Sequence, residues 1–154
     1  MLQGQRQRFT SPSAEETIRI AAEFAATIRR GDVIALYGDL GTGKTQFVKG
    51  VCSAFNVRGS VSSPTFVLLN RYEGVDPAGE ELLIYHLDLY RTRSLEEIYD
   101  LGYEEFFFGQ NICLIEWADQ VEQLLPVKHY AVHLMHGEHE YERQLSIEQI
   151  EKRS

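Results

Sequence analysis

Residues 38–45 contain the residue types and spacing in this sequence that point most clearly to chemistry. They read GDLGTGKT, which satisfies the pattern G-x-x-x-x-G-K-[ST]. Glycines let successive backbone N–H groups turn inward around an anion, because no Cβ obstructs them. Lys44 would supply an ammonium to the β- and γ-phosphates of a nucleotide, and the Thr45 hydroxyl would ligate Mg²⁺. The chemistry expected of this run is therefore the binding of a nucleoside triphosphate.

The sequence on either side of this glycine-rich loop supports that prediction. The apolar run VIALY (33–37) precedes the loop, and residues 44–55 carry apolar side chains on one helical stripe. A buried strand before the loop and an amphipathic helix after it distinguish a phosphate loop from a chance turn. The predicted nucleotide-binding residues of this stretch are Gly38, Asp39, Leu40, Gly41, Thr42, Gly43, Lys44, Thr45 and Gln46.

Two later apolar runs each end in an acidic residue, and a phosphate loop needs a carboxylate at a strand end to hold its metal. LLIYHLD ends in Asp88, and NICLIE ends in Glu116. If both runs are strands parallel to residues 33–37, these carboxylates emerge at the same sheet edge as Lys44. For either acid alone, a solvated side chain or a helix cap is the ordinary alternative. The residues by themselves leave open which carboxylate binds the metal and which positions water.

Two further features lie near this expected edge. His86 shares a strand face with Asp88, because side chains alternate along a strand, so it could orient Asp88, with simple packing as the default. The polar run SSPT (62–65) lies between the helix and the next strand, where a segment sensing the γ-phosphate would lie. An ordinary connecting turn is the alternative for that run.

The elements that must position these residues alternate between strands and helices. This alternation predicts an α/β fold of three layers, with a mixed, mostly parallel central sheet and a C-terminal hairpin. The length of 154 residues fits a single domain over residues 1–154. The expected elements are a helix at 13–30 with Ser13 and Glu16 as a capping box, a strand at 33–37, a helix at 44–55, a hairpin of 66–74 and 81–90, a helix at 94–109 in two pieces around Gly102, a buried strand at 111–117, a short helix at 118–125 and a hairpin over 130–147.

Composition and charge exclude several classes of protein. Fifteen Lys and Arg against 23 Asp and Glu give a net charge of −8, which disfavours strong direct binding to nucleic acid. Apolar stretches are too short for a membrane span, and the N-terminus lacks the apolar core of a secretory signal. We therefore expect a cytoplasmic protein without membrane attachment.

The cysteines and histidines give no metal pattern. Cys52 and Cys113 are the only two cysteines, and each stands alone, which predicts buried free thiols. Three of the five histidines fall in HLMHGEHE (133–140), where Gly137 separates two alternating runs. This pattern predicts an exposed hairpin with solvated histidines rather than a metal site.

Four motifs in order resemble the TsaE (YjeE) family, the small bacterial ATPases of tRNA threonylcarbamoyladenosine synthesis. They are GDLGTGKT (38–45), SPTF (63–66), HLDLYR (86–91) and IEW (115–117). The similarity covers essentially the whole chain, and HLDLYR is much more specific than the glycine loop. The resemblance implies a P-loop fold, ATP with Mg²⁺ as ligands, and weak hydrolysis unless partner proteins are present.

The resemblance also implies roles for individual residues. Thr45 and Glu116 would hold the metal, and Asp88, the second essential carboxylate and a further metal candidate, would position or activate the attacking water. With Lys44, these two acids form the predicted catalytic group. The other positions that the resemblance singles out are Trp117 as a functionally sensitive aromatic or a core anchor, His86 within its motif, Thr65 near the γ-phosphate, and Thr10 and Arg143 near the adenine.

The resemblance implies TsaD and TsaB as protein partners and tRNA as an indirect one, reached through that complex. The run FFF (106–108) could supply an apolar docking surface, with core packing as the alternative. A P-loop kinase with Asp88 as base and the Arg91 and Arg93 pair as phosphate clamps stays open, as does a nucleotide-dependent regulatory switch. A GTPase-like switch is disfavoured, because the N-K-x-D signature is missing from the sequence.

Overall fold

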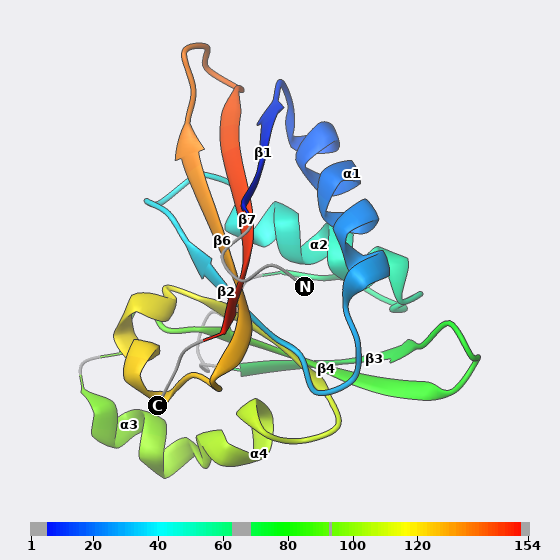
Figure 1. Cartoon of the computed structure of the whole chain (residues 1–154), viewed down its shortest axis with the longest axis vertical. Helices are drawn as coiled ribbons and strands as arrows, with labels where there is room; N and C mark the ends of the chain where they lie inside the picture. Colours follow the sequence, from blue (N-terminus) through cyan, green and yellow to red (C-terminus); the bar gives the residue numbers. More distant parts are fainter. Residues whose placement is uncertain (1–5, 63–68, 93, 152–154) are drawn as a thin grey trace.

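The computed structural model describes residues 6–62, 69–92 and 94–151, and it has helices on both faces of one sheet (Figure 1). The elements follow one another as β1 (Arg6–Ser11), α1 (Ala14–Phe24), η1 (Ala25–Thr27), β2 (Val33–Tyr37), α2 (Lys44–Ala54), β3 (Leu69–Val75), β4 (Glu81–Asp88), α3 (Leu95–Leu101), α4 (Tyr103–Phe107), β5 (Ile112–Glu116), η2 (Ala118–Leu124), β6 (Lys128–His136) and β7 (Arg143–Glu151). Here η1 and η2 are 3₁₀ helices.

The sheet has seven strands in the order β1-β7-β6-β2-β5-β4-β3. Its central strands β6, β2, β5 and β4 run parallel to one another. The remaining pairings, β1 with β7, β7 with β6, and β3 with β4, are antiparallel. This confirms the predicted α/β fold with a mixed sheet that is parallel at its centre, and it confirms both predicted hairpins. Since β2, β4 and β5 are parallel, their carboxyl ends meet at one edge.

Alternating side chains divide the core between the two faces of the sheet. In β2, Ile34 and Leu36 pack on the face covered by α1 and α2, whereas Val33 and Ala35 pack on the face covered by α3, α4 and η2. Because both faces are covered, VIALY reads as a continuous apolar run rather than an alternating one.

The helices α1 and α2 approach closely at Gly50. A Cβ on this residue would lie 2.2 Å from the carbonyl oxygen of Ile18 and 2.6 Å from the Cβ of Ala21. Only glycine therefore permits this crossing, which supports the helix that begins at the glycine loop.

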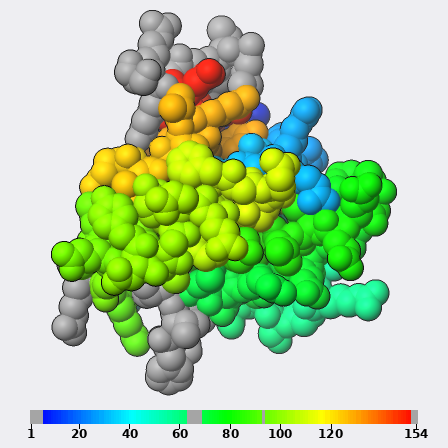
Figure 2. Space-filling model, turned by 90° about the horizontal axis from the view of Figure 1, so that it is seen from below, coloured from blue at the N-terminus to red at the C-terminus, as the bar shows by residue number. Residues whose placement is uncertain are grey.

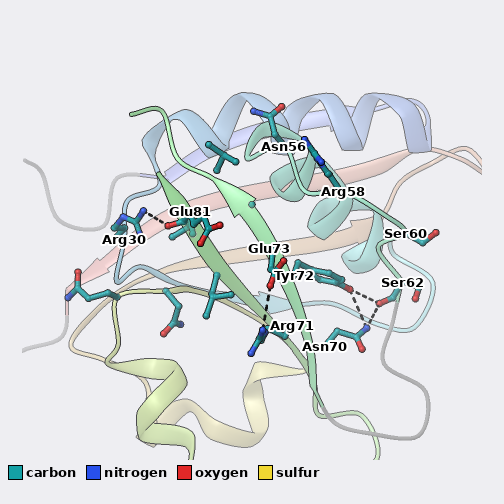
Figure 3. Close-up of a pocket in the computed structure, with 16 residues that line it drawn as sticks. Arg30, Asn56, Arg58, Ser60, Ser62, Asn70, Arg71, Tyr72, Glu73 and Glu81 are labelled. Carbon is teal, nitrogen blue, oxygen red and sulfur yellow. Dashed lines mark hydrogen bonds and ion pairs between the residues drawn. The ribbon is translucent and has the colours of Figure 1, made fainter. Parts of the chain in front are cut away.

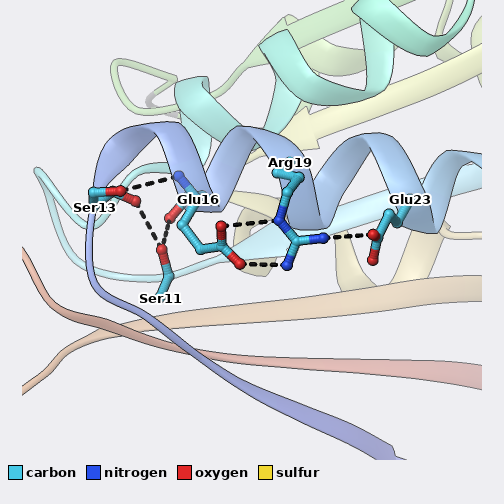
Figure 4. A network of polar contacts seen from close by, with 6 residues as sticks. Ser11, Ser13, Glu16, Arg19 and Glu23 are labelled. Carbon is cyan, nitrogen blue, oxygen red and sulfur yellow. Dashed lines mark hydrogen bonds and ion pairs between the residues drawn. The ribbon is translucent and has the colours of Figure 1, made fainter.

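The first turn of α1 is held by a serine cap (Figure 4). The Ser13 hydroxyl accepts a hydrogen bond from the Glu16 backbone N–H at 3.1 Å, and Ser11 donates to the Ser13 carbonyl at 2.8 Å. The Glu16 carboxylate turns toward Arg19 rather than back to the cap, so half of the predicted capping box forms. An arginine one turn along the helix competes for the carboxylate that the box would use.

One predicted helix is shorter in the structure, and one strand was not predicted. The helix expected at 13–30 ends at Phe24 and continues only as η1, where the Thr27 hydroxyl donates to the Phe24 carbonyl at 2.8 Å. Ile28 is already extended, because the chain turns there toward β2. The strand β1 has no counterpart in the prediction, since its polar run shows no apolar alternation and it forms by pairing with the distant β7.

The face formed by α3 and α4 is seen in Figure 2, where these helices lie across it in yellow-green. Their predicted break at Gly102 is confirmed, with this glycine at φ 80°. In the FFF run, Phe106 and Phe107 are buried in the core, and Phe108 is 59% exposed. Most of that run therefore packs in the core, which was the alternative to an apolar docking surface.

The predicted burial of both cysteines and the predicted exposure of the three clustered histidines are confirmed. Cys52 and Cys113 are buried free thiols, and the three histidines of residues 133–140 have exposed side chains. In the part of the chain that the structure describes, no helix has the length and apolar character needed to cross a membrane.

Candidate functional site

The glycine loop joins the carboxyl end of β2 to the first residue of α2. Gly38, Gly41 and Gly43 have φ values of 150°, 80° and 101°, which side chains with a Cβ rarely adopt. A Cβ at Gly38 would lie 2.5 Å from the Leu134 carbonyl oxygen of β6. The Thr42 hydroxyl donates to the Asp39 carbonyl at 2.8 Å and closes the turn. Both the conformation and the close packing of this loop therefore require glycine.

Lys44 is held at the base of this loop. Its ammonium donates to the carbonyl oxygens of Gly38 at 2.6 Å and Asp39 at 2.9 Å, and it lies 4.2 Å from the centroid of the Trp117 ring. Burial lowers the pKa of Lys44, while Glu116 and other nearby carboxylates oppose that shift. A cation is thus fixed where the helix dipole of α2 also favours an anion.

Trp117 directly follows β5 and has a backbone conformation that is unusual for a bulky residue. Its φ of 60° and ψ of 46° place it in the left-handed region. The indole ring faces Lys44 on one side and packs against Tyr90, with ring centroids 4.9 Å apart. Trp117 is therefore part of the site's wall as well as a packing residue, and its strained backbone aims the ring at the lysine.

Glu116, at the end of β5, connects the sheet to the first turn of α2. Its Oε2 atom accepts a hydrogen bond from the Thr45 hydroxyl at 3.0 Å. The same oxygen lies 2.6 Å from Nε2 of His86. His86 was expected to pack, with orientation of Asp88 as the other possibility; it is buried as expected, and its ring contacts Glu116 rather than Asp88. The side chain of His86 points to the same sheet face as Glu116 and is fully buried there.

Asp88, at the end of β4, is the Cα partner of Glu116 in the parallel pairing of β4 with β5. Burial raises the pKa of Asp88, the Tyr90 N–H that donates to Oδ1 at 3.0 Å lowers it, and the neighbouring Glu116 raises it further. The two strand-end carboxylates are thus adjacent, at the sheet edge where β2 delivers the glycine loop.

One of the two residues carried over for adenine contacts touches the loop. From β7, Arg143 donates to the Gly41 carbonyl at 3.2 Å. Thr10 lies on the neighbouring β1, where its hydroxyl donates to the Gln144 side chain at 3.0 Å. Arg143 therefore contacts the loop directly, and Thr10 is one strand removed.

The other predicted residues are placed as follows. Asp39 and Leu40 are exposed at the loop tip, with Leu40 68% exposed, and Gln46 is half-buried in the first turn of α2. Arg91 is exposed just after β4. Thr65 and Arg93 fall outside the described residues.

The donor set matches the preference of Mg²⁺ for oxygen ligands. Thr45 contributes a hydroxyl, and Glu116 and Asp88 contribute carboxylates. Within residues 6–62, 69–92 and 94–151, no three His, Cys, Asp or Glu side chains gather to hold a metal by themselves. Magnesium beside a phosphate loop needs only one or two carboxylates, because phosphates and water complete its coordination. These residues fit that arrangement.

Tyr90 and Tyr72 are two site neighbours that sequence reasoning missed. Tyr90 packs on Trp117, and it lies two residues after Asp88 in HLDLYR, so that motif could have indicated it. Tyr72 contacts His86 across strands, with its hydroxyl 3.2 Å from Nδ1. No local pattern indicates Tyr72, because the contact depends on the register of β3 with β4.

Comparison with known proteins gives a consistent result. The family model described as "Threonylcarbamoyl adenosine biosynthesis protein TsaE" matches residues 11–145. A relative from Bacillus subtilis (strain 168), named tRNA threonylcarbamoyladenosine biosynthesis protein TsaE, is 42% identical over 120 residues, covering 77% of this chain and 71% of its own length. A relative of the same name from Rickettsia bellii (strain RML369-C) is 44% identical over 123 residues, covering 79% of this chain and 81% of its own.

A solved structure has the same fold. The crystal structure of Bacillus subtilis YdiB superposes with a TM-score of 0.77 at 31% sequence identity, covering 97% of this chain and 88% of that one. The glycine loop between β2 and α2 and the parallel strands beside it therefore form a P-loop NTPase fold. The matched model spans the loop, both strand-end carboxylates and Trp117, and this chain belongs to the TsaE family.

Proposed function

We propose that this chain binds and hydrolyses ATP in support of the threonylcarbamoylation of tRNA adenosine, together with the TsaD and TsaB proteins. The observation that carries the proposal is the hydrogen bond from the Thr45 hydroxyl to Glu116, beside Asp88. This bond connects the first turn of the helix after the phosphate loop to a carboxylate of the kind that a metal requires. The chain is also a member of the TsaE family.

Each residue would have a distinct task in hydrolysis. Lys44 would leave its loop carbonyls for the β- and γ-phosphates, because charged phosphate oxygens are stronger acceptors than amides. Thr45 and Glu116 would hold Mg²⁺, which when bound neutralises charge on the phosphates. Asp88 would position the attacking water and accept its proton, and its raised pKa makes it a stronger base than an ordinary aspartate.

The charge of the molecule agrees with an indirect role toward tRNA. A net charge of −8 repels a phosphate backbone, so the partners would make most of the tRNA contact. A function on tRNA with these partners also implies a cytoplasmic location. Strands from both ends of the chain, β1 and β7, pair in the same sheet, which supports residues 1–154 acting as one domain.

Turnover measurements test the function directly. We expect slow ATP hydrolysis by the protein alone, loss of hydrolysis on removal of Mg²⁺ with EDTA, and stimulation by TsaD with TsaB. Small hydroxyl acceptors serve as the comparison, because stimulation by one of them and not by the protein pair would favour the P-loop kinase alternative.

Substitutions test the assigned residues. Lys44→Ala should abolish tight ATP binding, whereas Lys49→Ala, a lysine on the same helix, should not. Asp88→Asn should lower kcat by about 10²-fold or more with little effect on ATP binding, because it removes the proton acceptor. Asp100→Asn on α3 is its matched control. Full activity in both Asp88→Asn and Glu116→Gln would refute the site assignment.

A further inference from the structure

A line of buried polar side chains leads from Glu116 across the sheet to its β3 edge. Nε2 of the fully buried His86 lies 2.6 Å from Glu116 Oε2, and Nδ1 of the same ring lies 3.2 Å from the Tyr72 hydroxyl. Tyr72 in turn donates to the Ser62 carbonyl oxygen at 3.0 Å. We call Glu116, His86, Tyr72 and the Ser62 carbonyl the polar relay.

The relay is produced by the strand register. Glu116, His86 and Tyr72 come from β5, β4 and β3, which are successive neighbours in the sheet. His86 pairs with Leu114, two residues before Glu116, and Tyr72 pairs with Ile84, two residues before His86. A step of two residues keeps a side chain on the same face. The three side chains therefore form a diagonal row on the face covered by α1 and α2.

Hydrogen-bond chemistry fixes the orientation of the middle residue. A carboxylate oxygen only accepts, so His86 must donate through Nε2–H to Glu116. Its Nδ1 then faces the Tyr72 hydroxyl at 3.2 Å. That hydroxyl has one proton, so it holds the ring from the other side when it donates to Nδ1 rather than to the Ser62 carbonyl. Glu116 Oε2 thus accepts from His86 and from Thr45, and rotation of the carboxylate would break both bonds.

The far end of the relay reaches an open groove of about 1260 Å³ beside β3 (Figure 3). Tyr72, Asn70 and Ser62 line this groove. Figure 3 shows the Tyr72 hydroxyl and the Asn70 amide both directed at the Ser62 carbonyl, with Asn70 donating to it at 2.9 Å. The tyrosine is therefore anchored at the groove wall, outside the nucleotide site.

We propose that His86 and Tyr72 are positioning residues that aim the Glu116 carboxylate at the magnesium of the bound nucleotide. This inference rests on the proposed function, and it assigns to these residues the supporting hydrogen bonds that metal-binding carboxylates need. Loss of such supporting partners typically weakens metal affinity by about 10–100-fold. Tyr72 would exert this effect through His86 alone, from a neighbouring strand.

The test is a magnesium titration of the full chain with a nonhydrolysable ATP analogue. Trp117 is the only tryptophan in the sequence and faces Lys44, so its fluorescence reports on the site. Tyr72→Phe removes one hydroxyl and keeps the ring. We expect it to raise the half-saturating Mg²⁺ concentration by about tenfold, and to leave binding of the analogue in EDTA unchanged.

Tyr130→Phe is the matched control. Tyr130 also packs on the core under α1, and its hydroxyl also donates to a backbone carbonyl, that of Thr27 at 3.4 Å, but it has no link to Glu116. We expect this variant to titrate with Mg²⁺ as the wild type does.

Two substitutions at His86 test the middle of the relay. His86→Leu removes the donor to Glu116. It should raise the half-saturating Mg²⁺ concentration more than Tyr72→Phe does. His86→Gln offers an amide N–H to Glu116 and should recover much of that loss. If His86→Leu does not fold, Tyr72→Phe and His86→Gln still decide the question.

The outcomes separate the relay from the proposed function. If analogue binding by the wild type does not depend on Mg²⁺, both the proposed function and the role of the relay are wrong. A normal wild type with unchanged Mg²⁺ half-saturation in Tyr72→Phe overturns the relay alone. Equal weakening of analogue binding with and without Mg²⁺ also overturns it, because a merely structural role would act in that way.

Discussion

Glu116 is the single residue on which most of the candidate site converges. Its carboxylate accepts a hydrogen bond from the Thr45 hydroxyl and contacts His86. It also lies opposite Asp88 in the sheet, and its charge opposes the lowering of the Lys44 pKa by burial. A carboxylate held by several partners has one orientation, which is what a metal ligand needs. The adjacent Trp117 has a strained backbone, and strain of this kind persists only where the surrounding structure enforces it.

Gly38→Ala tests whether the glycine loop is packed as tightly as the structure shows. The new Cβ would lie 2.5 Å from the Leu134 carbonyl oxygen and 2.7 Å from the Thr42 hydroxyl. We expect a loss of about 1–3 kcal/mol in the free energy of unfolding, measured by urea denaturation, together with weaker ATP binding.

Gly41→Ala is the control in the same loop. Its φ of 80° also disfavours alanine, but a Cβ there meets nothing within 4 Å. We expect only the cost of the left-handed conformation, about 1–2 kcal/mol. If Gly41→Ala were as damaging as Gly38→Ala, backbone conformation alone would explain both, and close packing against β6 would not be needed.

Among the elements, the parallel strands β2, β5 and β4 do most to build the site. Their carboxyl ends carry the glycine loop, Glu116 and Asp88 in adjacent positions. The hairpin of β3 and β4 depends in turn on its tight turn at Asp76. There Asp76 Oδ1 accepts from the backbone N–H groups of Ala78 and Glu80 at 2.9 Å each, and Arg30 donates to Oδ2 at 2.7 Å.

Asp76→Asn should make the hairpin less stable in a pH-dependent way. The Glu80 N–H, followed by Arg30, lowers the pKa of Asp76 in the folded protein. An acid with a lowered folded pKa stabilises the protein above its unfolded value, about 4, and loses that contribution as the pH falls through the folded pKa. We therefore expect Asp76→Asn to unfold at lower urea concentration than the wild type at pH 7.

The difference between the two proteins should shrink as the pH is lowered below about 4, because the wild-type carboxyl becomes neutral there in the unfolded chain and, at lower pH, in the folded protein as well. Asp100→Asn, an exposed position on α3, provides the comparison. A stability gap that stayed constant from pH 7 to pH 3 would show that the charge of Asp76 contributes nothing to the turn.

The molecule as a whole consists of two apolar cores separated by one sheet. Each core contains one cysteine: Cys52 lies on the α1 and α2 face, and Cys113 lies on the α3 and α4 face. Both side chains are inaccessible. Burial raises the pKa of the Cys52 thiol to about 12, and it also raises the pKa of Cys113. Each thiol therefore reports on the opening of its own face.

Thiol labelling measures whether the two cores open together. Because β2, β4 and β5 each contribute side chains to both cores, we expect Cys52 and Cys113 to react with a thiol reagent at the same slow rate at pH 8, and rapidly in urea. Peptide mass spectrometry distinguishes the two sites. Faster labelling of one cysteine in the native protein would mean that its face opens independently.

The sequence by itself determined the features that depend on neighbouring residues. The glycine loop, the buried run VIALY and the helix after it are adjacent in the chain, so pattern and spacing predict them. The strand-end acids Asp88 and Glu116 were likewise predictable, because an apolar run that stops at a carboxylate is a local signal. The family resemblance followed from four such short motifs, and the comparisons support it.

Only the tertiary structure decided the contacts between segments that are far apart in the chain. These include the pairing of β1 with β7, the hydrogen bond from Arg143 to the loop, and the link from Tyr72 through His86 to Glu116. His86 was expected to pack or to orient Asp88, two residues away, yet its ring also contacts Glu116 on the next strand. Such contacts are set by strand register and sheet order, and a shift of one residue would turn each side chain to the other face.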